Sequence, residues 1–262
     1  EVKLFNKSSA TPVFTIGNNI FGQDVKDVAM SANGKYFAIC SYKGVYFFST
    51  SSSVPLWSAT EHESYCTNNA HGNNIVISDD GKYLAHATEY VNDLSERFFY
   101  AYNTSTGTKI LSQISTSDAY SVDISADGSY LVAGDHRHVR VFELSSIKGT
   151  YDSKWVNELG YYNVYDVDIS ADGKFIAAIH GNDCCDQDTR GIHYFSIDSS
   201  TALWEVNPTP VSNWYSVSMS DNGRVIAGTR DYSQSTYVYS WEYASASFLK
   251  QYSPADYSLV DS

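Results

Sequence analysis

Five segments of the chain repeat one pattern of polar and hydrophobic positions. Each segment has Ser, one variable residue, Asp or Asn, and Gly, followed by a hydrophobic run; the segments are "SANGKYFAIC", "SDDGKYLAHA", "SADGSYLVAG", "SADGKFIAAI" and "SDNGRVIAGT". Their glycines lie 47, 47, 45 and 50 residues apart by subtraction, at Gly34, Gly81, Gly128, Gly173 and Gly223. A period of this length is typical of architectures in which each repeat forms one supersecondary unit.

Each repeat is predicted to contain a hairpin around its glycine. Before the turn the pattern alternates, with Val122 and Ile124 on one face and Asp123 on the other, as in a half-buried strand. The Asp-Gly or Asn-Gly pair then supplies the positive φ of a tight turn. The run after the turn, such as "YLVAG", is too apolar for a half-exposed strand and suits a central strand buried on both faces.

Two further strands follow in every repeat. The third strands are predicted at "GVYFFS", "RFFYAYN", "HVRVFEL", "IHYFSI" and "TYVYSWEY", and the fourth at "PLWSA", "KILSQ", "KWVNEL", "ALWEV" and "SFLKQY". Four antiparallel strands in about 45 residues make one blade of a β-propeller, and no segment has a helical period of useful length. We therefore predict an all-β fold, with residues 1–262 forming a single β-propeller domain of four-stranded antiparallel blades.

The repeats resemble the WD40/YVTN-type and quinoprotein-like (PQQ-like) propeller repeats of secreted proteins. The shared core is "S-x-D-G-K-Y-L-A", and the resemblance covers essentially the whole chain. The segment "AYNTSTGTKIL" is similar to the quinoprotein docking motif A-x-D-x-x-T-G-x-x-x-W, with Asn103 in the Asp place and Leu111 in the Trp place. Trp57 and Trp204 lie on corresponding fourth strands. The Gly-His and Trp-Asp pairs of strict WD40 repeats are absent, so the resemblance implies a WD40-like propeller.

The ends of the chain align with parts of a blade. Residues 2–16 match residues 45–59, a third and a fourth strand, and "YSLVDS" at 257–262 matches the first strand "YSVDIS" at 120–125. We expect the two ends to share a closing blade, because such closure removes unpaired strand edges. Five complete blades and this composite blade make six. The composite lacks its second strand, which indicates a truncated ring, a piece of a larger protein, or a strand contributed by another molecule.

The composition points to an exported protein. Hydrophobic residues make up 43% of the chain and charged residues 18%, which is a globular composition, and Tyr is abundant at 22 residues. The formal net charge of −13 repels phosphate backbones, so we expect no nucleic-acid partner. No apolar run approaches the roughly 20 residues that span a bilayer. The start at Glu1 fits a processed product whose signal peptide has been removed, or an excised domain.

Candidate binding residues flank the shared core of each repeat. The alignment places three tyrosines just before the first strands and three ionisable residues just past the second strands: Tyr120, Tyr165, Tyr215, Asp135, His180 and Arg230. A ring of Tyr suits a recognition surface, and equally it would cap the hydrophobic layer between blades. The ionisable trio comes from different blades. Because no nucleophile stands in a recognisable setting, we assign no catalytic residue.

The segment "HGNDCCDQDTRG" at 180–191 is the richest in chemistry. Its carboxylates at Asp183, Asp186 and Asp188 are candidate Ca²⁺ ligands, although a solvated charged loop is the simpler interpretation. No other cofactor is expected. His136 and His138 share a strand face, which would allow a surface metal site.

Four cysteines allow three pairings. Cys40 ends a second strand and Cys66 lies in the segment that leads into the next blade, on the same face, so a bridge between them is geometrically allowed. Cys184 and Cys185 would then pair with each other or stay free. The quinoprotein resemblance implies a further alternative, because quinoprotein alcohol dehydrogenases carry a vicinal cysteine pair beside their quinone.

The sequence favours a secreted or cell-surface, non-enzymatic scaffold that binds a protein or a glycan through its loops. The sequons at Asn6 and Asn103 would then make it a glycoprotein. Two alternatives stay open. One is a structural subunit of an extracellular assembly or filament, as a homo-oligomer or a larger complex, and the other is a quinone- or metal-dependent oxidoreductase.

Overall fold

The structure, a computed structural model, describes most of the chain. The described residues are 1–22, 24–60, 66, 74–88, 97–115, 118–145, 153–160, 163–181, 191–206, 214–230, 236–241, 246–252 and 259–260, with side chains up to residue 229. All regular structure in these residues is β. Among them there is no helix long and apolar enough to cross a membrane. The predicted all-β class is therefore confirmed.

Four sheets consist of four antiparallel strands in the predicted order, and a fifth sheet has the same four with β23 (Leu259–Val260) added at its edge. The first contains β3 (Val25–Met30), β4 (Tyr36–Ser41), β5 (Gly44–Ser49) and β6 (Trp57–Ala59). The second contains β7 (Ile75–Ile77), β8 (Tyr83–Ala87), β9 (Arg97–Asn103) and β10 (Thr108–Ser115). The third contains β11 (Ala119–Ile124), β12 (Tyr130–Asp135), β13 (His138–Glu143) and β14 (Trp155–Glu158). The fourth contains β15 (Asn163–Ile169), β16 (Phe175–Gly181), β17 (Gly191–Ser196) and β18 (Ala202–Val206). The fifth contains β19 (Trp214–Met219), β20 (Val225–Arg230), β21 (Thr236–Trp241) and β22 (Ala246–Tyr252).

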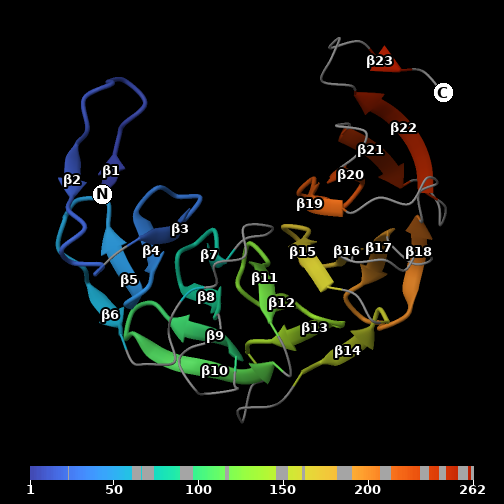
Figure 1. Cartoon of the computed structure of the whole chain (residues 1–262), viewed down its shortest axis with the longest axis horizontal. Coiled ribbons are helices and arrows are strands. Elements are labelled where there is room, and N and C mark those ends of the chain that lie inside the picture. Colours follow the sequence, from blue (N-terminus) through green and yellow to red (C-terminus); the bar gives the residue numbers. More distant parts are fainter. Residues whose placement is uncertain are drawn as a thin grey trace.

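The sheets stand side by side as blades along an open arc (Figure 1). Their first strands, β3, β7, β11, β15 and β19, line the inner side of the arc, and their fourth strands lie toward the outside. The third strands β5 and β9 have the bounds that the sequence predicted, and the other third strands agree within a few residues. The hydrophobic period of two therefore located the strands reliably.

The hairpin turn explains why every repeat carries Ser as well as Gly. The five turn glycines have φ between 66° and 77°, the left-handed conformation that favours glycine. The Ser125 hydroxyl donates to Asp127 Oδ1 at 2.9 Å and accepts the backbone N–H of Tyr130 at 3.0 Å. The same pair of bonds recurs at Ser31, Ser78, Ser170 and Ser220. Ser and Asp or Asn therefore stabilise the turn by side-chain bonds to its backbone.

The hydrophobic core is divided into layers between neighbouring blades. One layer joins Ala38 and Phe47 of the first blade to Ile75 and Leu84 of the second. Comparable layers separate the other blades. The second strands of the first four blades are buried on both faces, as their apolar sequences predicted, whereas β20 of the fifth blade exposes Val225. Each blade is therefore held in place mainly by burial against its neighbours.

Two tryptophans add polar contacts between blades. Trp57 Nε1 donates to the carbonyl of Thr104 at 2.7 Å, and Trp155 Nε1 donates to the carbonyl of Ile197 at 2.7 Å. Both acceptors lie just after the third strand of the following blade. These two bonds attach the fourth strand of one blade to the next blade. Trp57 lies on a fourth strand, as the resemblance to the quinoprotein docking motif implied.

The ends of the chain differ from the prediction. β1 (Val2–Leu4) and β2 (Phe14–Ile16) form a separate two-stranded sheet at one end of the arc. β23 (Leu259–Val260) pairs with β22 as a fifth strand of the last sheet, and not with β1 or β2. The expectation that both termini build one closing blade is thus not met, because the edge of β22 already provides the hydrogen-bond partners for β23. Figure 1 shows the two ends of the arc standing apart.

Candidate functional site

The three tyrosines predicted before the first strands form a row across the blades. Tyr120 and Tyr165 have ring centroids 5.6 Å apart, and Tyr165 and Tyr215 have centroids 6.1 Å apart. Tyr120 and Tyr165 are buried, and Tyr215 is half-buried. Because the rings contact one another, they fill the space between adjacent first strands, which is the packing alternative that the sequence left open. Their use as a binding surface stays a prediction.

Asp135 is fully buried within its own blade. Its carboxylate accepts hydrogen bonds from His138 Nδ1 at 2.9 Å and Arg140 Nε at 3.0 Å, and from the backbone N–H of Arg137 at 3.0 Å. Burial alone would raise the pKa of Asp135, but these hydrogen bonds and the Arg140 charge lower it below its ordinary value. Asp135 is therefore an anionic anchor for the turn between β12 and β13. His136 contacts Asn163 Oδ1 instead, so the two histidines face different partners.

His180 is also buried and pairs with the neighbouring strand. Its Nε2 lies 2.8 Å from Nε2 of His193, and His193 Nδ1 lies 3.6 Å from Glu205 Oε2. Burial lowers the pKa of His180 to about 3 and that of His193 to about 4, so both rings are neutral near pH 7. The pair borders a cavity of 510 Å³ between the third and fourth blades, which Asn157 and Trp204 also line.

A common site of the ionisable trio stays a prediction, because the structure describes the side chains of Asp135 and His180 only. Asp135 contacts its own blade and accepts a hydrogen bond from Ser115 of the second blade, and His180 contacts its own blade. Only the backbone of Arg230 is described, paired with Trp214. Asp183, Asp186, Asp188, Cys184 and Cys185 lie outside the described residues.

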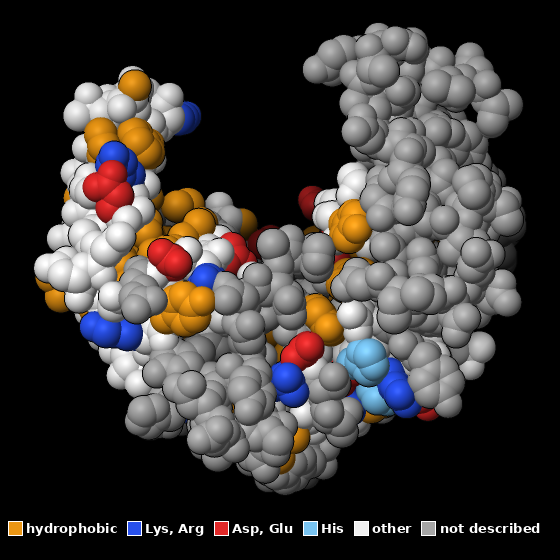
Figure 2. Space-filling view, viewed as in Figure 1, with side chains coloured by type: hydrophobic (Ala, Val, Ile, Leu, Met, Phe, Trp, Pro, Cys, Tyr) orange, Lys and Arg blue, Asp and Glu red, His pale blue; other side chains and the backbone are white. Residues whose placement is uncertain are grey.

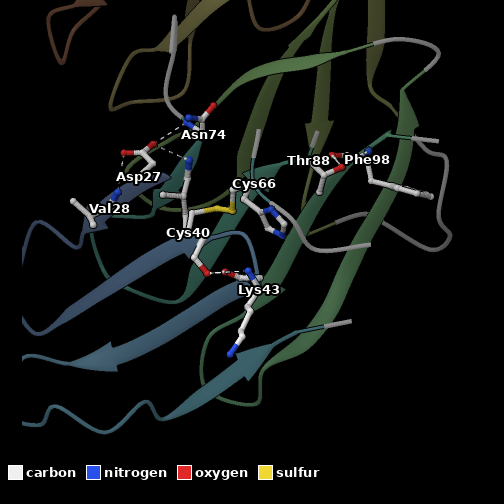
Figure 3. Close-up of a disulfide and its surroundings, with 12 residues drawn as sticks. Asp27, Val28, Cys40, Lys43, Cys66, Asn74, Thr88 and Phe98 are labelled. Carbon is white, nitrogen blue, oxygen red and sulfur yellow. Dashed lines mark hydrogen bonds between the residues drawn. A yellow bond between two sulfur atoms is a disulfide. The ribbon is translucent and has the colours of Figure 1, made fainter. Parts of the chain in front are cut away.

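Cys40 and Cys66 form the disulfide that the sequence allowed (Figure 3). Their Cα atoms are 5.7 Å apart and both side chains are fully buried. The imidazole of His86 lies close by, within 4.8 Å of both sulfur atoms through one ring nitrogen. Cys66 also forms an isolated bridge with Thr88, next to the second blade, so the disulfide links the first blade to the second.

The two sequons lie where the sequence placed them. Asn6 is exposed just after β1, and the half-buried Asn103 ends β9. Their Oδ1 atoms accept hydrogen bonds from Ser8 and Ser105, respectively. Glycosylation at these sites stays a prediction.

A group of inner-strand aspartates connects neighbouring blades, and the sequence pattern does not single it out. Asp27 Oδ2 accepts the backbone N–H of Asn74 at 2.9 Å, as Figure 3 shows. Asp123, Asp166 and Asp168 make the same kind of bond to the following blade, at 2.9, 2.9 and 2.7 Å. The signal in the sequence is an acidic residue on the polar face of the first strand, a face that alternation alone assigns to solvent.

Burial changes the ionisation of these aspartates. It raises the pKa of Asp166 to about 7, and the nearby Asp168 carboxylate contributes to the rise. It also raises the pKa values of Asp123 and Asp168, whose carboxyl groups interact with each other. The inner side of the arc therefore holds protonated carboxyl groups at mildly acidic pH.

Replacing Asp166 by Asn should change the stability more favourably, relative to the wild type, at pH 8 than at pH 5. The folded pKa of Asp166 is raised to about 7, so its contribution to stability is complete below the unfolded pKa of about 3.9 and is lost as pH rises through 7. The melting temperature of Asp166→Asn minus that of the wild type should thus increase from pH 5 to pH 8. Calorimetry at several pH values measures this difference, and a difference independent of pH would contradict it.

Comparisons with known proteins agree with the propeller fold of the described residues. The family model described as WD domain, G-beta repeat matches residues 107–143. The structure titled "Crystal Structure of Mitotic Checkpoint Complex" is similar with a TM-score of 0.66 and 14% sequence identity, over 87% of this chain and 66% of that chain. The present chain thus spans just under two thirds of that structure's length. Kuenenia stuttgartiensis hydrazine synthase is similar with a TM-score of 0.65 and 13% identity, over 95% of this chain and 70% of that chain. A search of curated protein sequences found no match.

At these identities the likenesses concern the fold alone. Together with the blade arrangement they show a β-propeller fold, in which residues 107–143 match a WD40-type repeat.

Proposed function

We propose that the protein is a non-enzymatic scaffold of the cell surface or the extracellular space that binds a protein partner through the first-blade end of its arc. The observation that carries the proposal is an uncovered apolar face on β3. Val28 is 54% exposed and Met30 is 52% exposed, on the same face of the strand. Exposed neighbouring apolar side chains favour a protein partner, because a hydroxyl-rich glycan would leave them without complementary contact.

Two further features support this function. Propellers of this class hold their surfaces on a rigid framework, so that binding loses little conformational entropy. The buried disulfide Cys40–Cys66 supports an extracellular location, since such bonds persist in oxidising compartments. Figure 2 shows hydrophobic side chains gathered on the part of the arc that contains β1 to β5.

Site-specific photo-crosslinking in the native source tests the proposal. A benzophenone amino acid in place of Val28 should yield protein adducts of defined mass, and excess unlabelled protein should compete with their formation. Val54, which is 68% exposed outside the strands of the first blade, is the matched control position and should give no such adduct. Identical adducts from both positions, or none from Val28, would refute the proposal.

A further inference from the structure

Three side chains of the fourth blade form a row on one face of its sheet. The strand register pairs His193 of β17 with Ala178 of β16 and with Glu205 of β18. Successive side chains of a strand alternate between the two faces, so His180, two residues after Ala178, shares the face of His193. The row therefore joins two imidazoles and one carboxylate across three neighbouring strands.

The two imidazoles meet through ring nitrogens that can act as metal ligands. His180 Nε2 lies 2.8 Å from His193 Nε2, and the ring centroids are 4.7 Å apart with the ring planes inclined by 48°. A metal ion that two imidazoles bind at about 2.0–2.1 Å holds their nitrogens roughly 2.9–3.4 Å apart. The two nitrogens therefore need to move apart only slightly to share a metal ion.

Glu205 favours one position of the proton on the His193 ring. Its Oε2 atom lies 3.6 Å from His193 Nδ1. A carboxylate attracts an N–H, so it favours the proton on Nδ1 and leaves Nε2 with its lone pair toward His180. Metal-binding histidines commonly have a carboxylate near the second nitrogen, which fixes the ring orientation and raises the basicity of the ligating atom. Glu205 is therefore a positioning residue and not a ligand.

The histidine pair is buried in the blade and borders a cavity. His180 is 1% exposed and His193 is 8% exposed. Both line the cavity of 510 Å³, which Asn157 of the third blade also lines. The Oδ1 atom of Asn157 is buried and has no hydrogen-bond partner among the described residues, whereas its Nδ2 atom donates to the carbonyl of Ser200 at 2.6 Å. The cavity therefore has room for water ligands, at about 30 Å³ each, and contains an acceptor that such water can satisfy.

A hydrogen bond between two neutral rings is the simpler explanation of the 2.8 Å contact. In that case His180 Nε2 carries a proton and donates to the bare Nε2 of His193. A metal ion displaces this proton to solvent and uses the lone pairs of both nitrogens. The carboxylate behind His193 and the unpartnered oxygen of Asn157 favour the metal site, because the hydrogen bond requires neither.

We propose that His180 and His193 bind a divalent transition-metal ion through their Nε2 atoms, with water in the cavity completing its coordination. Imidazole suits Zn²⁺, Cu²⁺ and Ni²⁺, whereas Mg²⁺ and Ca²⁺ prefer oxygen ligands. The ion links β16 to β17 beside the junction with the third blade. This site is separate from the face of the first blade at which partner binding is proposed.

Isothermal titration calorimetry of the 262-residue chain with Zn²⁺ tests the site. The wild type should bind Zn²⁺ saturably, and His180→Gln and His193→Gln should each weaken that binding at least tenfold. Glu205→Gln should weaken it roughly tenfold, as expected for a residue that orients a ligand. Absence of Zn²⁺ binding to the wild type, or an affinity that neither histidine substitution changes, would overturn the proposal and leave the hydrogen bond as the explanation.

Matched variants separate this site from other metal-binding groups of the chain. His136→Gln removes a half-buried histidine of the third blade that contacts Asn163, and it should leave the affinity for Zn²⁺ unchanged. Cys184→Ser/Cys185→Ser should also leave it unchanged, because the proposed site has no thiolate ligand. Equal weakening by His136→Gln and His180→Gln, or loss of binding in the serine variant, would overturn the proposal.

Electron paramagnetic resonance with Cu²⁺ counts the nitrogen ligands in the wild type, so its result holds even where a histidine variant fails to fold. The spectrum with one equivalent of Cu²⁺ should show splitting from two imidazole nitrogens. Glu205→Gln should keep this splitting while it weakens binding, because Glu205 orients His193 without touching the ion. A wild-type spectrum without two nitrogen ligands would overturn the proposal, and loss of the splitting in Glu205→Gln would overturn the positioning role of Glu205.

Discussion

Replacing Gly81 by Ala is expected to lower the free energy of unfolding by about 2–4 kcal/mol, whereas Gly34→Ala should cost only about 1 kcal/mol. Both residues have positive φ, 77° and 66°, so the conformational strain of an alanine backbone is similar at the two positions. Only Gly81 is in contact with the preceding blade, where the new methyl group would overlap the Tyr36 ring. The difference between the two losses of unfolding free energy therefore measures the contribution of packing between two blades.

Thermal unfolding of the two variants provides the measurement. For a domain of this size the Gly81→Ala loss corresponds to a fall in melting temperature of roughly 5–12 °C, and the Gly34→Ala loss to a few degrees. Equal losses would contradict the asymmetry between the two turns.

Removal of the disulfide should have an effect of similar size. The double variant Cys40→Ala/Cys66→Ala is expected to lose about 3 kcal/mol of stability, because the bond closes a loop with a sequence separation of 26 residues. The melting temperature should fall by roughly 5–12 °C. The first and second blades should separate more readily, since Cys66 is bridged to Thr88 beside the second blade.

Chemical reduction supplies the control for this prediction. A reductant should lower the melting temperature of the wild type by nearly the same amount and leave the double variant unchanged. Cys184→Ser/Cys185→Ser serves as the comparison variant and should keep the full response to reductant. A wild type that is insensitive to reductant would show that the bond contributes little to stability.

The candidate site was less predictable than the strands. The repeat pattern identifies Asp135 and His180 by position, just past the second strands, but position does not reveal their partners. Asp135 is bound by His138 and Arg140 of its own blade, and His180 contacts His193 on the adjacent strand. Contacts of this kind depend on strand register and on burial, which a linear pattern does not encode.

The aspartates on the first strands illustrate the same limit. Alternation places Asp123 opposite Val122 and Ile124, which suggests solvent. In the propeller the first strands of neighbouring blades lie side by side, so the polar face of one strand meets the backbone of the next. Their raised pKa values follow from that arrangement.

The sequence by itself determined the repeat, the strands and the turns, because these depend on side-chain alternation and on local backbone chemistry around Ser, Asp and Gly. Only the tertiary structure decided which residues are buried between blades, that β23 pairs with β22, and that the face of Val28, Met30 and Gly34 is uncovered. These properties depend on which blade stands next to which. Identical local patterns therefore have different surroundings at the end of the arc and in its middle.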